Sequence, residues 1–242
     1  MDIGTPYRDL GEIELEPLLS YVNALTEEDW QRNPLRQDLF ADGAHSVTQA
    51  IVLKHEWHSG ANSVRYDYVE DLIHAWGLQR GIDPTPFMPV ERQDTDLGPV
   101  YSYPEWFALR HVVEAVVERA IARLRTPHGI VTRVALVRLH PGGRIKAHVD
   151  GQPMAARAHR LHIPLIVPPN VVYIVGDRKF SMARGHVYDF NNRWKHAVRH
   201  EGKRPRVNLF VDYYPDPGVA IRPFHELGPM FATTRAKLVG GR

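Results

Sequence analysis

The chain has 242 residues, of which 43% are hydrophobic and 24% charged, close to the values of ordinary globular proteins, so fibrous and low-complexity classes are excluded. Its 30 basic and 28 acidic side chains leave a formal net charge of +2, too small to indicate a dedicated polyanion binder. The chain has no cysteine, so a metal ion would need His, Asp or Glu as protein ligands.

The amino-terminal sequence favours a cytoplasmic protein. Met1 is followed by an acidic segment rather than by the basic and apolar regions of a secretory signal. The longest nearly uncharged run, residues 161–176, contains three prolines and falls short of the ~20 residues that a membrane-spanning helix needs. This run predicts two buried strands around a turn, and we expect no membrane partner.

The first half of the chain carries mainly helical patterns. Apolar side chains in residues 15–22 share one helix face, and Thr26, followed by three acidic residues, is typical of a helix N-cap. Another helix is expected to begin near Asp67. The longest pattern runs from Pro104, suited to the first helical position, to about Leu124. Its apolar stripe is expected to be buried core: Trp106, Leu109, Val113, Val116, Val117, Ala120 and Leu124.

From residue 131 the pattern changes to short β-branched and aromatic runs separated by Gly, Pro and Asn. The spacing of these runs predicts an antiparallel sandwich or barrel. No linker or block of charge separates the two halves, so we predict one domain, mainly β with flanking helices, in which N-terminal helices brace the β core. The strands are expected at residues 131–140, 160–167, 171–175, 186–190 and 206–214.

Half of the histidines gather in the β-rich part of the chain: 7 of 14 lie between residues 140 and 200. The tripeptide His148-Val149-Asp150 stands out, because residues i and i+2 of a strand project to the same face, where an imidazole and a carboxylate can share one ion. Glycine and proline on both sides place the pair near a strand end. A His-x-Asp sequence also occurs by chance, so this pair alone does not establish a metal site.

His196 is the best candidate for a third ligand, because the intervening chain is long enough to return across a small sandwich. Two histidines and one carboxylate form a facial triad, which leaves three positions of an octahedral iron open for a bidentate co-substrate and dioxygen. Zn²⁺ or Mn²⁺ could use the same ligands, so the triad does not by itself identify the reaction.

Arg206 opens an alternating strand, and its side chain would point to the same face as Asn208 and Phe210. An inward arginine on a half-buried strand is costly unless it meets an anion, and its planar fork suits a carboxylate. A bound dicarboxylate would satisfy this side chain. Alternatively, Arg206 lies on an edge strand and pairs with an acidic side chain at the surface.

Several segments together resemble the aspartyl/asparaginyl β-hydroxylase family. Members of this family are Fe(II)- and 2-oxoglutarate-dependent dioxygenases on a double-stranded β-helix, a cupin-like jelly roll. The resemblance covers residues 131–214, which would be the catalytic core. Residues 1–130 would then be mostly helical support that holds substrate determinants, and residues 215–242 a C-terminal extension. The segments that carry the resemblance are residues 138–150, 160–165, 185–192, 196–198 and 206–212.

The resemblance implies a role for each matching residue. His148, Asp150 and His196 match the iron ligands, and Arg206 matches the arginine that holds the distal carboxylate of 2-oxoglutarate. A further pair, Arg160 and His162, matches residues placed against the co-substrate near the metal. The implied reaction uses O₂ and releases succinate and CO₂.

The carboxylate of Asp150 places the chain nearer the bacterial branch of the family, which includes hydroxylases of free proline. Vertebrate aspartyl hydroxylases lack a carboxylate at this position.

Other histidines and basic residues receive no role in the predicted site. His45, His55 and His58 have no spacing that requires a metal. The basic run at residues 193–206 could attract an anionic substrate or nucleic acid, but a solvated connection between strands is the better interpretation, so we expect no nucleic-acid partner. Four histidines are expected at the surface or hydrogen-bonded in the core: His140, His159, His186 and His200.

Three functional interpretations compete. The leading one is a 2-oxoglutarate-dependent hydroxylase of an amino acid, either free or within a peptide or small natural product. The second is a cupin-type metalloenzyme, an isomerase or a co-substrate-free dioxygenase, in which Arg206 binds the substrate carboxylate. The third is a non-catalytic cupin-like binding module. The complete triad together with Arg206 argues against this third interpretation.

Overall fold

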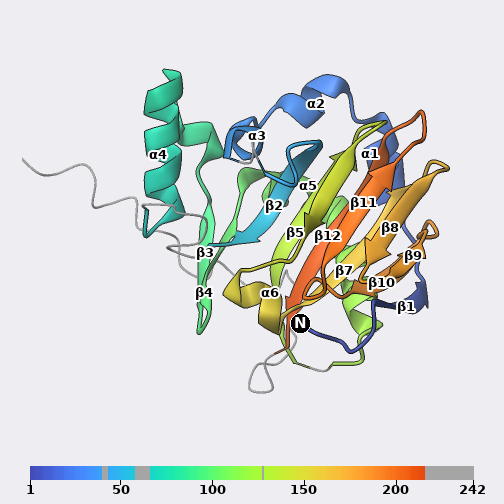
Figure 1. The fold of residues 1–242 in the computed structure, drawn as a ribbon. Helices are drawn as coiled ribbons and strands as arrows, with labels where there is room; N and C mark the ends of the chain where they lie inside the picture. The colour runs from blue at the N-terminus through green and yellow to red at the C-terminus, as the bar shows by residue number, and fades with distance from the viewer. Residues whose placement is uncertain (40–42, 58–65, 127, 216–242) are drawn as a thin grey trace, which may run out of the picture.

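The computed structural model describes residues 1–39, 43–57, 66–126 and 128–215, and within them two antiparallel sheets face each other (Figure 1). The predicted C-terminal extension beyond residue 215 lies outside the described residues. The larger sheet has eight strands in the order β1-β10-β7-β12-β5-β2-β4-β3, and the smaller has four in the order β6-β11-β8-β9. The predicted mainly β fold of the jelly-roll type is confirmed.

Five of the eight carboxyl-terminal strands correspond to the predicted runs, whereas three short strands, at residues 144–148, 178–180 and 196–200, were not among them. Three of the five have the predicted bounds, and two begin and end one residue earlier. The strands of this half are β5 (Ile130–Leu139), β6 (Arg144–His148), β7 (His159–Ile166), β8 (Val171–Val175), β9 (Arg178–Phe180), β10 (His186–Phe190), β11 (His196–His200) and β12 (Arg206–Tyr214).

The amino-terminal half contributes four strands that the sequence patterns did not predict. One of them, β2, pairs with β5 in the middle of the larger sheet, and β1 pairs with β10 at its edge. The description of residues 1–130 as helical support is therefore incomplete, since this half also extends the sheet. These strands are β1 (Tyr7–Glu12), β2 (Thr48–Glu56), β3 (Glu91–Thr95) and β4 (Gly98–Ser102).

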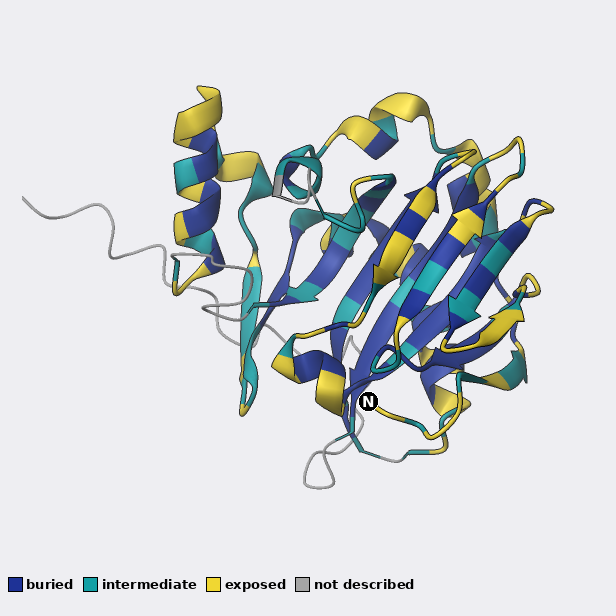
Figure 2. Cartoon of the chain, in the orientation of Figure 1, coloured by how far each residue is buried: buried dark blue, intermediate teal, exposed yellow. Residues whose placement is uncertain are grey.

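The predicted helices are present. The longest, α5, begins with Pro104 at its first position and ends at Ala122. Thr26 caps α2 through reciprocal bonds with Asp29, as its N-cap pattern predicted. α4 is buried along one side and exposed along the other (Figure 2). The helices are α1 (Leu18–Ala24), α2 (Glu27–Gln31), α3 (Leu35–Leu39), α4 (Val69–Arg80), the 3₁₀ turn η2 (Thr85–Phe87), α5 (Pro104–Ala122) and α6 (Pro153–Arg157).

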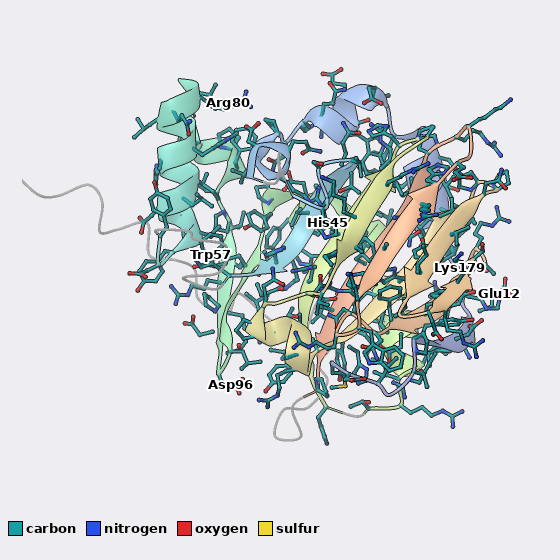
Figure 3. All side chains as sticks on the ribbon, in the orientation of Figure 1. Glu12, His45, Trp57, Arg80, Asp96 and Lys179 are labelled. Carbon is teal, nitrogen blue, oxygen red and sulfur yellow. The ribbon has the colours of Figure 1, made fainter. Side chains whose placement is uncertain are left out.

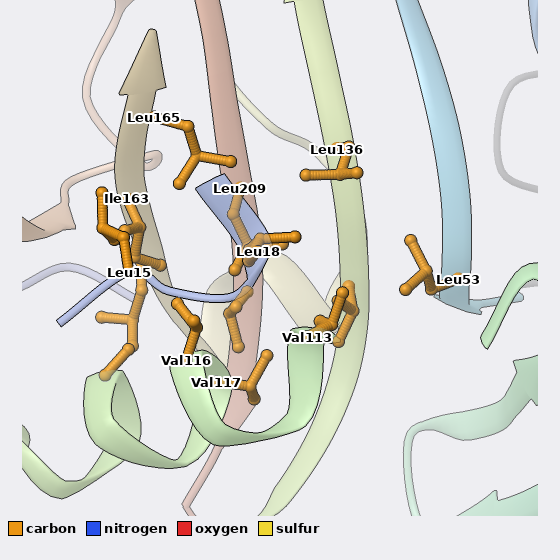
Figure 4. Packing of buried hydrophobic residues seen from close by; sticks show 14 of the residues in the cluster. Leu15, Leu18, Leu53, Val113, Val116, Val117, Leu136, Ile163, Leu165 and Leu209 are labelled. Carbon is orange, nitrogen blue, oxygen red and sulfur yellow. The ribbon is translucent and has the colours of Figure 1, made fainter. Parts of the chain in front are cut away.

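One face of the larger sheet forms the main core with α5. Val113, Val116 and Val117 of this helix pack with Leu136 of β5 and Leu209 of β12 (Figure 4). Burial of each such side chain contributes about 1.5–3 kcal/mol. α5 therefore fixes the position of the central strands, whose opposite face is turned toward the smaller sheet.

The alternation of side chains along β12 separates this core from a cavity. Val207, Leu209 and Val211 belong to the core, whereas Arg206 and Phe210 line the cavity between the sheets. In β5 and β7, likewise, every second side chain points toward the cavity. No helix in the described part of the chain is long and apolar enough to cross a membrane.

Candidate metal centre

His148 and His196 meet across the smaller sheet, although they lie far apart in the chain. His148 ends β6 and His196 begins β11, and the two residues are direct partners in the antiparallel ladder. Residues opposite each other in such a ladder project to the same face. Their ring centroids are 4.3 Å apart, so the pairing of two short strands brings the two predicted imidazoles together.

Each of these histidines has its tautomer set by a backbone carbonyl two residues earlier. His148 Nδ1 lies 2.8 Å from the Lys146 carbonyl oxygen, and His196 Nδ1 lies 2.9 Å from that of Trp194. Because a carbonyl only accepts, Nδ1 carries the hydrogen and Nε2 keeps its lone pair. His148 Nε2 is buried without a hydrogen-bond partner among the described residues. Both Nε2 atoms are therefore available to a metal.

Burial keeps His196 in the neutral form that a metal requires. Desolvation lowers the pKa of His196 to about 4, and the nearby His148 and Arg160 act in the same direction, against the Trp194 carbonyl. A neutral imidazole can offer its Nε2 lone pair at neutral pH without first losing a proton.

Asp150 joins the two imidazoles, but not from within the strand as its spacing predicted. β6 ends at His148, and the Asp150 backbone N–H donates instead to the Asn192 carbonyl at 3.2 Å. The Arg193 guanidinium also donates to the Asp150 carbonyl at 2.6 Å. Two contacts with the loop before β11 thus place the carboxylate, so the prediction of convergence is confirmed and its strand-based reason is wrong.

The Asp150 carboxylate lies close to both imidazoles. Asp150 Oδ1 lies 3.4 Å from His148 Nε2 and 3.9 Å from His196 Nε2. Ligands about 2.1 Å from one ion, at right angles to each other, would be about 3 Å apart. Small inward shifts of these side chains would therefore complete a facial set of two nitrogens and one oxygen.

Arg160 holds the second oxygen of the Asp150 carboxylate. Its Nη1 donates to Asp150 Oδ2, while Nε and Nη2 donate to the two oxygens of Asp212 at 2.8 and 2.6 Å. This fork fixes the guanidinium, and the guanidinium in turn orients the Asp150 carboxylate. The predicted contact between Arg160 and the co-substrate remains a prediction.

A line of alternating charges continues from Asp212 into the amino-terminal half. Arg133 lies 3.5 Å from Asp212 and donates to both oxygens of Glu56 in β2, at 2.5 and 3.2 Å. Burial alone would raise the pKa of Asp212, but Arg160 and Arg133 outweigh burial and hold this pKa below its ordinary value. Asp212 is therefore an anion between two cations.

Arg206 is a buried cation at the opposite wall of the cavity. It is 1% exposed, and β12 lies between β7 and β5, so the alternative of a surface edge strand is wrong. Among the described residues no carboxylate pairs with Arg206, and its Nε has no partner. When the Asn208 amide is oriented to satisfy its neighbours, its oxygen accepts from Arg206 Nη1 at 3.1 Å. An anionic ligand would supply the missing charge.

His162 of β7 lies opposite Phe210 of β12 and is buried like Arg206. Its ring stacks on Phe190, with centroids 4.5 Å apart, and its Nδ1 has no partner among the described residues. Burial, reinforced by Arg206 and Arg160, holds the pKa of His162 well below its ordinary value. The neutral ring therefore offers one polar atom to a ligand in the cavity.

All six predicted site residues line one cavity of about 320 Å³. The same cavity extends toward β2 and α4, where its lining is mostly apolar: Leu35, Val52, Trp57, Val69, Leu72 and Tyr103. The structure thus joins the candidate metal centre to an apolar far end that no sequence motif predicted.

His45 is the residue of this site that the sequence analysis left out. Its ring lies edge-on to His148, with centroids 4.7 Å apart, and one of its ring nitrogens lies within 4.8 Å of ligand atoms of both His148 and Asp150. Burial, reinforced by His148 and Arg36, lowers the pKa of His45 to about 3. No local spacing could have revealed it, because it reaches the site only through the pairing of β2 with β5.

The remaining histidines mostly agree with expectation. Four of them make hydrogen bonds away from the metal ligands: His140 to Gln49, His159 to Asp189, His186 to Asp9 and His200 to the Arg204 carbonyl. His55 lines the cavity, although its Nδ1 is engaged by the Glu56 carbonyl. His58 lies outside the described residues.

The comparison with known families agrees with the motifs. The sequence model described as aspartyl/asparaginyl beta-hydroxylase matches residues 112–215. The resemblance to this family is therefore confirmed over the segment that carries all six predicted site residues. No curated protein sequence gives a significant match.

Among similar solved structures is an oxidoreductase of the 2OG-Fe(II) oxygenase family from Burkholderia pseudomallei, with 13% identity, a TM-score of 0.42, and 88% of this chain and 95% of that chain covered. A viral collagen prolyl hydroxylase from Paramecium Bursaria Chlorella virus-1 has 11% identity, a TM-score of 0.43, and 90% and 98% coverage. A cupin domain from Bordetella pertussis has 18% identity, a TM-score of 0.28, and 36% and 94% coverage.

Proposed function

We propose, from the match of residues 112–215 to the aspartyl/asparaginyl β-hydroxylase family, that this chain is an Fe(II)- and 2-oxoglutarate-dependent dioxygenase. It hydroxylates an unactivated C–H bond of an amino acid, either free or within a peptide or small natural product. One observation carries the proposal: two imidazoles and a carboxylate converge in the same cavity as Arg206, a buried cation that no carboxylate among the described residues neutralises.

The ligand set suits iron and a chelating co-substrate. His148, Asp150 and His196 would hold Fe(II) and leave three positions of an octahedral ion open. These open positions would suit a chelating 2-oxo acid and dioxygen as its co-reactant. When bound, the iron supplies the oxidative chemistry, while the protein orients the reactants and excludes water.

The chain's own residues divide the work of binding. Arg206 would grip the distal carboxylate of 2-oxoglutarate with a charge-assisted pair of hydrogen bonds. The unpartnered Nδ1 of His162 would contact the same molecule, and Arg160 would keep the Asp150 carboxylate directed at the metal. Together these contacts fix the co-substrate between a cation and the metal.

The apolar far end of the cavity supports a substrate that presents an apolar group to the metal. Trp57, Leu72 and Tyr103 line this end, whereas the charges near it are engaged in the Glu56–Arg133 pair. A target carbon within such a group would be shielded from water.

The test is turnover of 2-oxoglutarate by the purified full chain, with iron and ascorbate and without a prime substrate. We expect slow formation of succinate that disappears in His148→Ala and Asp150→Ala but persists in His74→Ala, where an exposed imidazole on α4 is removed. Wild-type protein that is inert toward 2-oxoglutarate under all iron conditions would contradict the proposal and favour the cupin-type alternative, in which Arg206 binds the substrate carboxylate.

The substrate itself can be found by mass spectrometry of candidate amino acids and peptides. We expect a product heavier by one oxygen atom that forms only when iron and 2-oxoglutarate are both present. An addition of oxygen that does not require 2-oxoglutarate would also contradict the assignment.

A further inference from the structure

We infer that His45 is a fourth protein ligand of the metal centre and occupies a coordination position that the co-substrate and dioxygen need. This inference rests on the proposed function, because it assumes that His148, Asp150 and His196 bind the metal. It adds a residue from the amino-terminal half of the chain to a site otherwise built from the carboxyl-terminal half.

The position of the His45 ring supports a ligand role. One of its nitrogens lies within 4.8 Å of ligand atoms of His148 and Asp150, and those two atoms also lie within 4.8 Å of each other. Two ligands on opposite sides of an octahedral ion are about 4.2 Å apart when each bond is about 2.1 Å. The three groups can therefore reach one ion with small movements of their side chains.

The surroundings of His45 leave its ring available. Its backbone carbonyl accepts from the Thr48 N–H at 3.0 Å and from the Thr48 hydroxyl at 2.7 Å, which anchors the turn before β2. Within the described ranges no hydrogen bond involves the imidazole itself, which packs against the His148 ring at an interplanar angle of 87°. Figure 3 places His45 near β2 and β5.

The number of ligands gives this arrangement a chemical consequence. Three protein ligands leave three positions open, whereas a fourth leaves two. A chelating 2-oxo acid would fill both, and dioxygen could not then bind while His45 remains coordinated. His45 would therefore have to leave the metal before the reaction with dioxygen.

The inference can be tested by counting nitrogen ligands on Cu²⁺ bound to the full chain. Electron paramagnetic resonance resolves the coupling to imidazole nitrogens. We expect three nitrogens in the wild type and in the matched control His74→Ala, and two in His45→Ala. His45→Asn, which keeps a polar side chain of similar size, is expected to match His45→Ala and guards against a folding defect in the alanine variant.

Two further readouts separate coordination from packing. We expect the affinity for Co²⁺ to fall by about tenfold or more in both His45 variants and to stay unchanged in His74→Ala. The four protein ligands and a chelating 2-oxo acid together fill six positions, so the nitrogen count of the wild type should stay at three when 2-oxoglutarate is added without oxygen. A purely structural His45 would give two nitrogens in the wild type and would leave the Co²⁺ affinity unchanged in both variants.

The outcomes distinguish this inference from the proposed function. If His45→Ala keeps the wild-type nitrogen count and Co²⁺ affinity, the inference is overturned and the proposed function stands. If His148→Ala also leaves metal binding unchanged, the proposed function itself fails. If 2-oxoglutarate without oxygen lowers the nitrogen count of the wild type, the co-substrate itself displaces His45, and the inferred competition between His45 and dioxygen is overturned.

Discussion

The two ends of the cavity are built on different physical principles. At the metal end, Asp150, Arg160 and Asp212 are polar groups removed from water, and each is stabilised by an oppositely charged partner. At the far end, side chains such as Leu72 and Tyr103 resemble those of any hydrophobic core. A site can therefore be predicted from the sequence where charged residues occupy positions that should be buried. It cannot be predicted where apolar residues line a pocket, because these residues look like ordinary core.

The largest contrast should appear when one residue at each end is replaced. Asp150→Ala removes a metal ligand and leaves the Arg160 guanidinium without one of its carboxylates, so we expect metal affinity to fall by more than about 100-fold. Leu72→Ala at the far end should change the metal affinity by no more than about twofold from the wild type, because this side chain contacts none of the candidate ligands. Calorimetric titration with Co²⁺ measures both. Equal losses in the two variants would mean that the ends do not act separately.

The next contrast concerns the co-substrate. Arg206→Ala should raise the 2-oxoglutarate concentration needed for half-maximal turnover by about 10- to 100-fold, since a charge-assisted contact of about 1.5–3 kcal/mol is lost. The 2-oxoglutarate concentration that Arg206→Lys needs for half-maximal turnover should lie between those of Arg206→Ala and the wild type, because lysine keeps the charge but lacks the forked guanidinium. Succinate formation at varied 2-oxoglutarate measures the effect. An unchanged requirement in the alanine variant would place Arg206 outside the co-substrate site.

Asp212 provides a smaller and sharper test, because it acts on the metal only through Arg160. Asp212→Asn removes the charge that holds the guanidinium, so we expect Co²⁺ affinity to fall by about tenfold. The variant should also lose about 3 kcal/mol of stability, since a buried cation loses its partner.

Glu56→Gln is the matched control for Asp212→Asn at the other end of the line of charges. It should lower stability without changing Co²⁺ affinity, because Arg133 has no contact with the metal ligands. A metal affinity lowered equally by both substitutions would show that the whole line of charges, rather than Arg160, orients Asp150.

Much of the metal end could be predicted from the sequence for a definite reason. The strand β12 alternates Arg206, Asn208 and Phe210 with apolar residues, and this period of two determines both its structure and which side chains face the cavity. His148 and Asp150 are two residues apart in the chain, so the pair could be noticed in the sequence, although contacts with Asn192 and Arg193 place the Asp150 carboxylate. The sequence motifs therefore identified most of the site residues, even though Asp150 lies beyond the end of β6.

The far end could not be predicted because its structure depends on distant pairing. β3 contains mostly charged and polar residues, and β4 contains Gly98 and Pro99, so neither run has a strong strand propensity. Both belong to the sheet through β2, which pairs with β5. His45 reaches the candidate metal centre by the same route, and nothing near it in the sequence marks it as part of the site.

The smallest expected effect concerns a surface contact that joins the amino-terminal helices to β5. The Glu27 carboxylate accepts from Arg138 Nη2 at 2.7 Å and from Gln31 Nε2 at 2.8 Å, and these bonds lower its pKa to about 2. A carboxyl group whose folded pKa is depressed stabilises the protein above its unfolded pKa, about 4.5, and loses this contribution as the pH falls toward 2.

Because the Glu27 side chain is 58% exposed, Glu27→Gln should cost no more than about 1 kcal/mol at pH 7. Urea unfolding at pH 7 and near pH 2.5 measures the free energy of unfolding of the variant and the wild type. The difference between the two proteins should be smaller at the lower pH. Glu28→Gln, which alters an exposed neighbour in the same helical turn, serves as the control and should show no such change. A cost for Glu27→Gln that persists at low pH would mean that the side chain stabilises α2 by packing. The surface contact between the two regions would then not be electrostatic, unlike the buried line of charges beneath it.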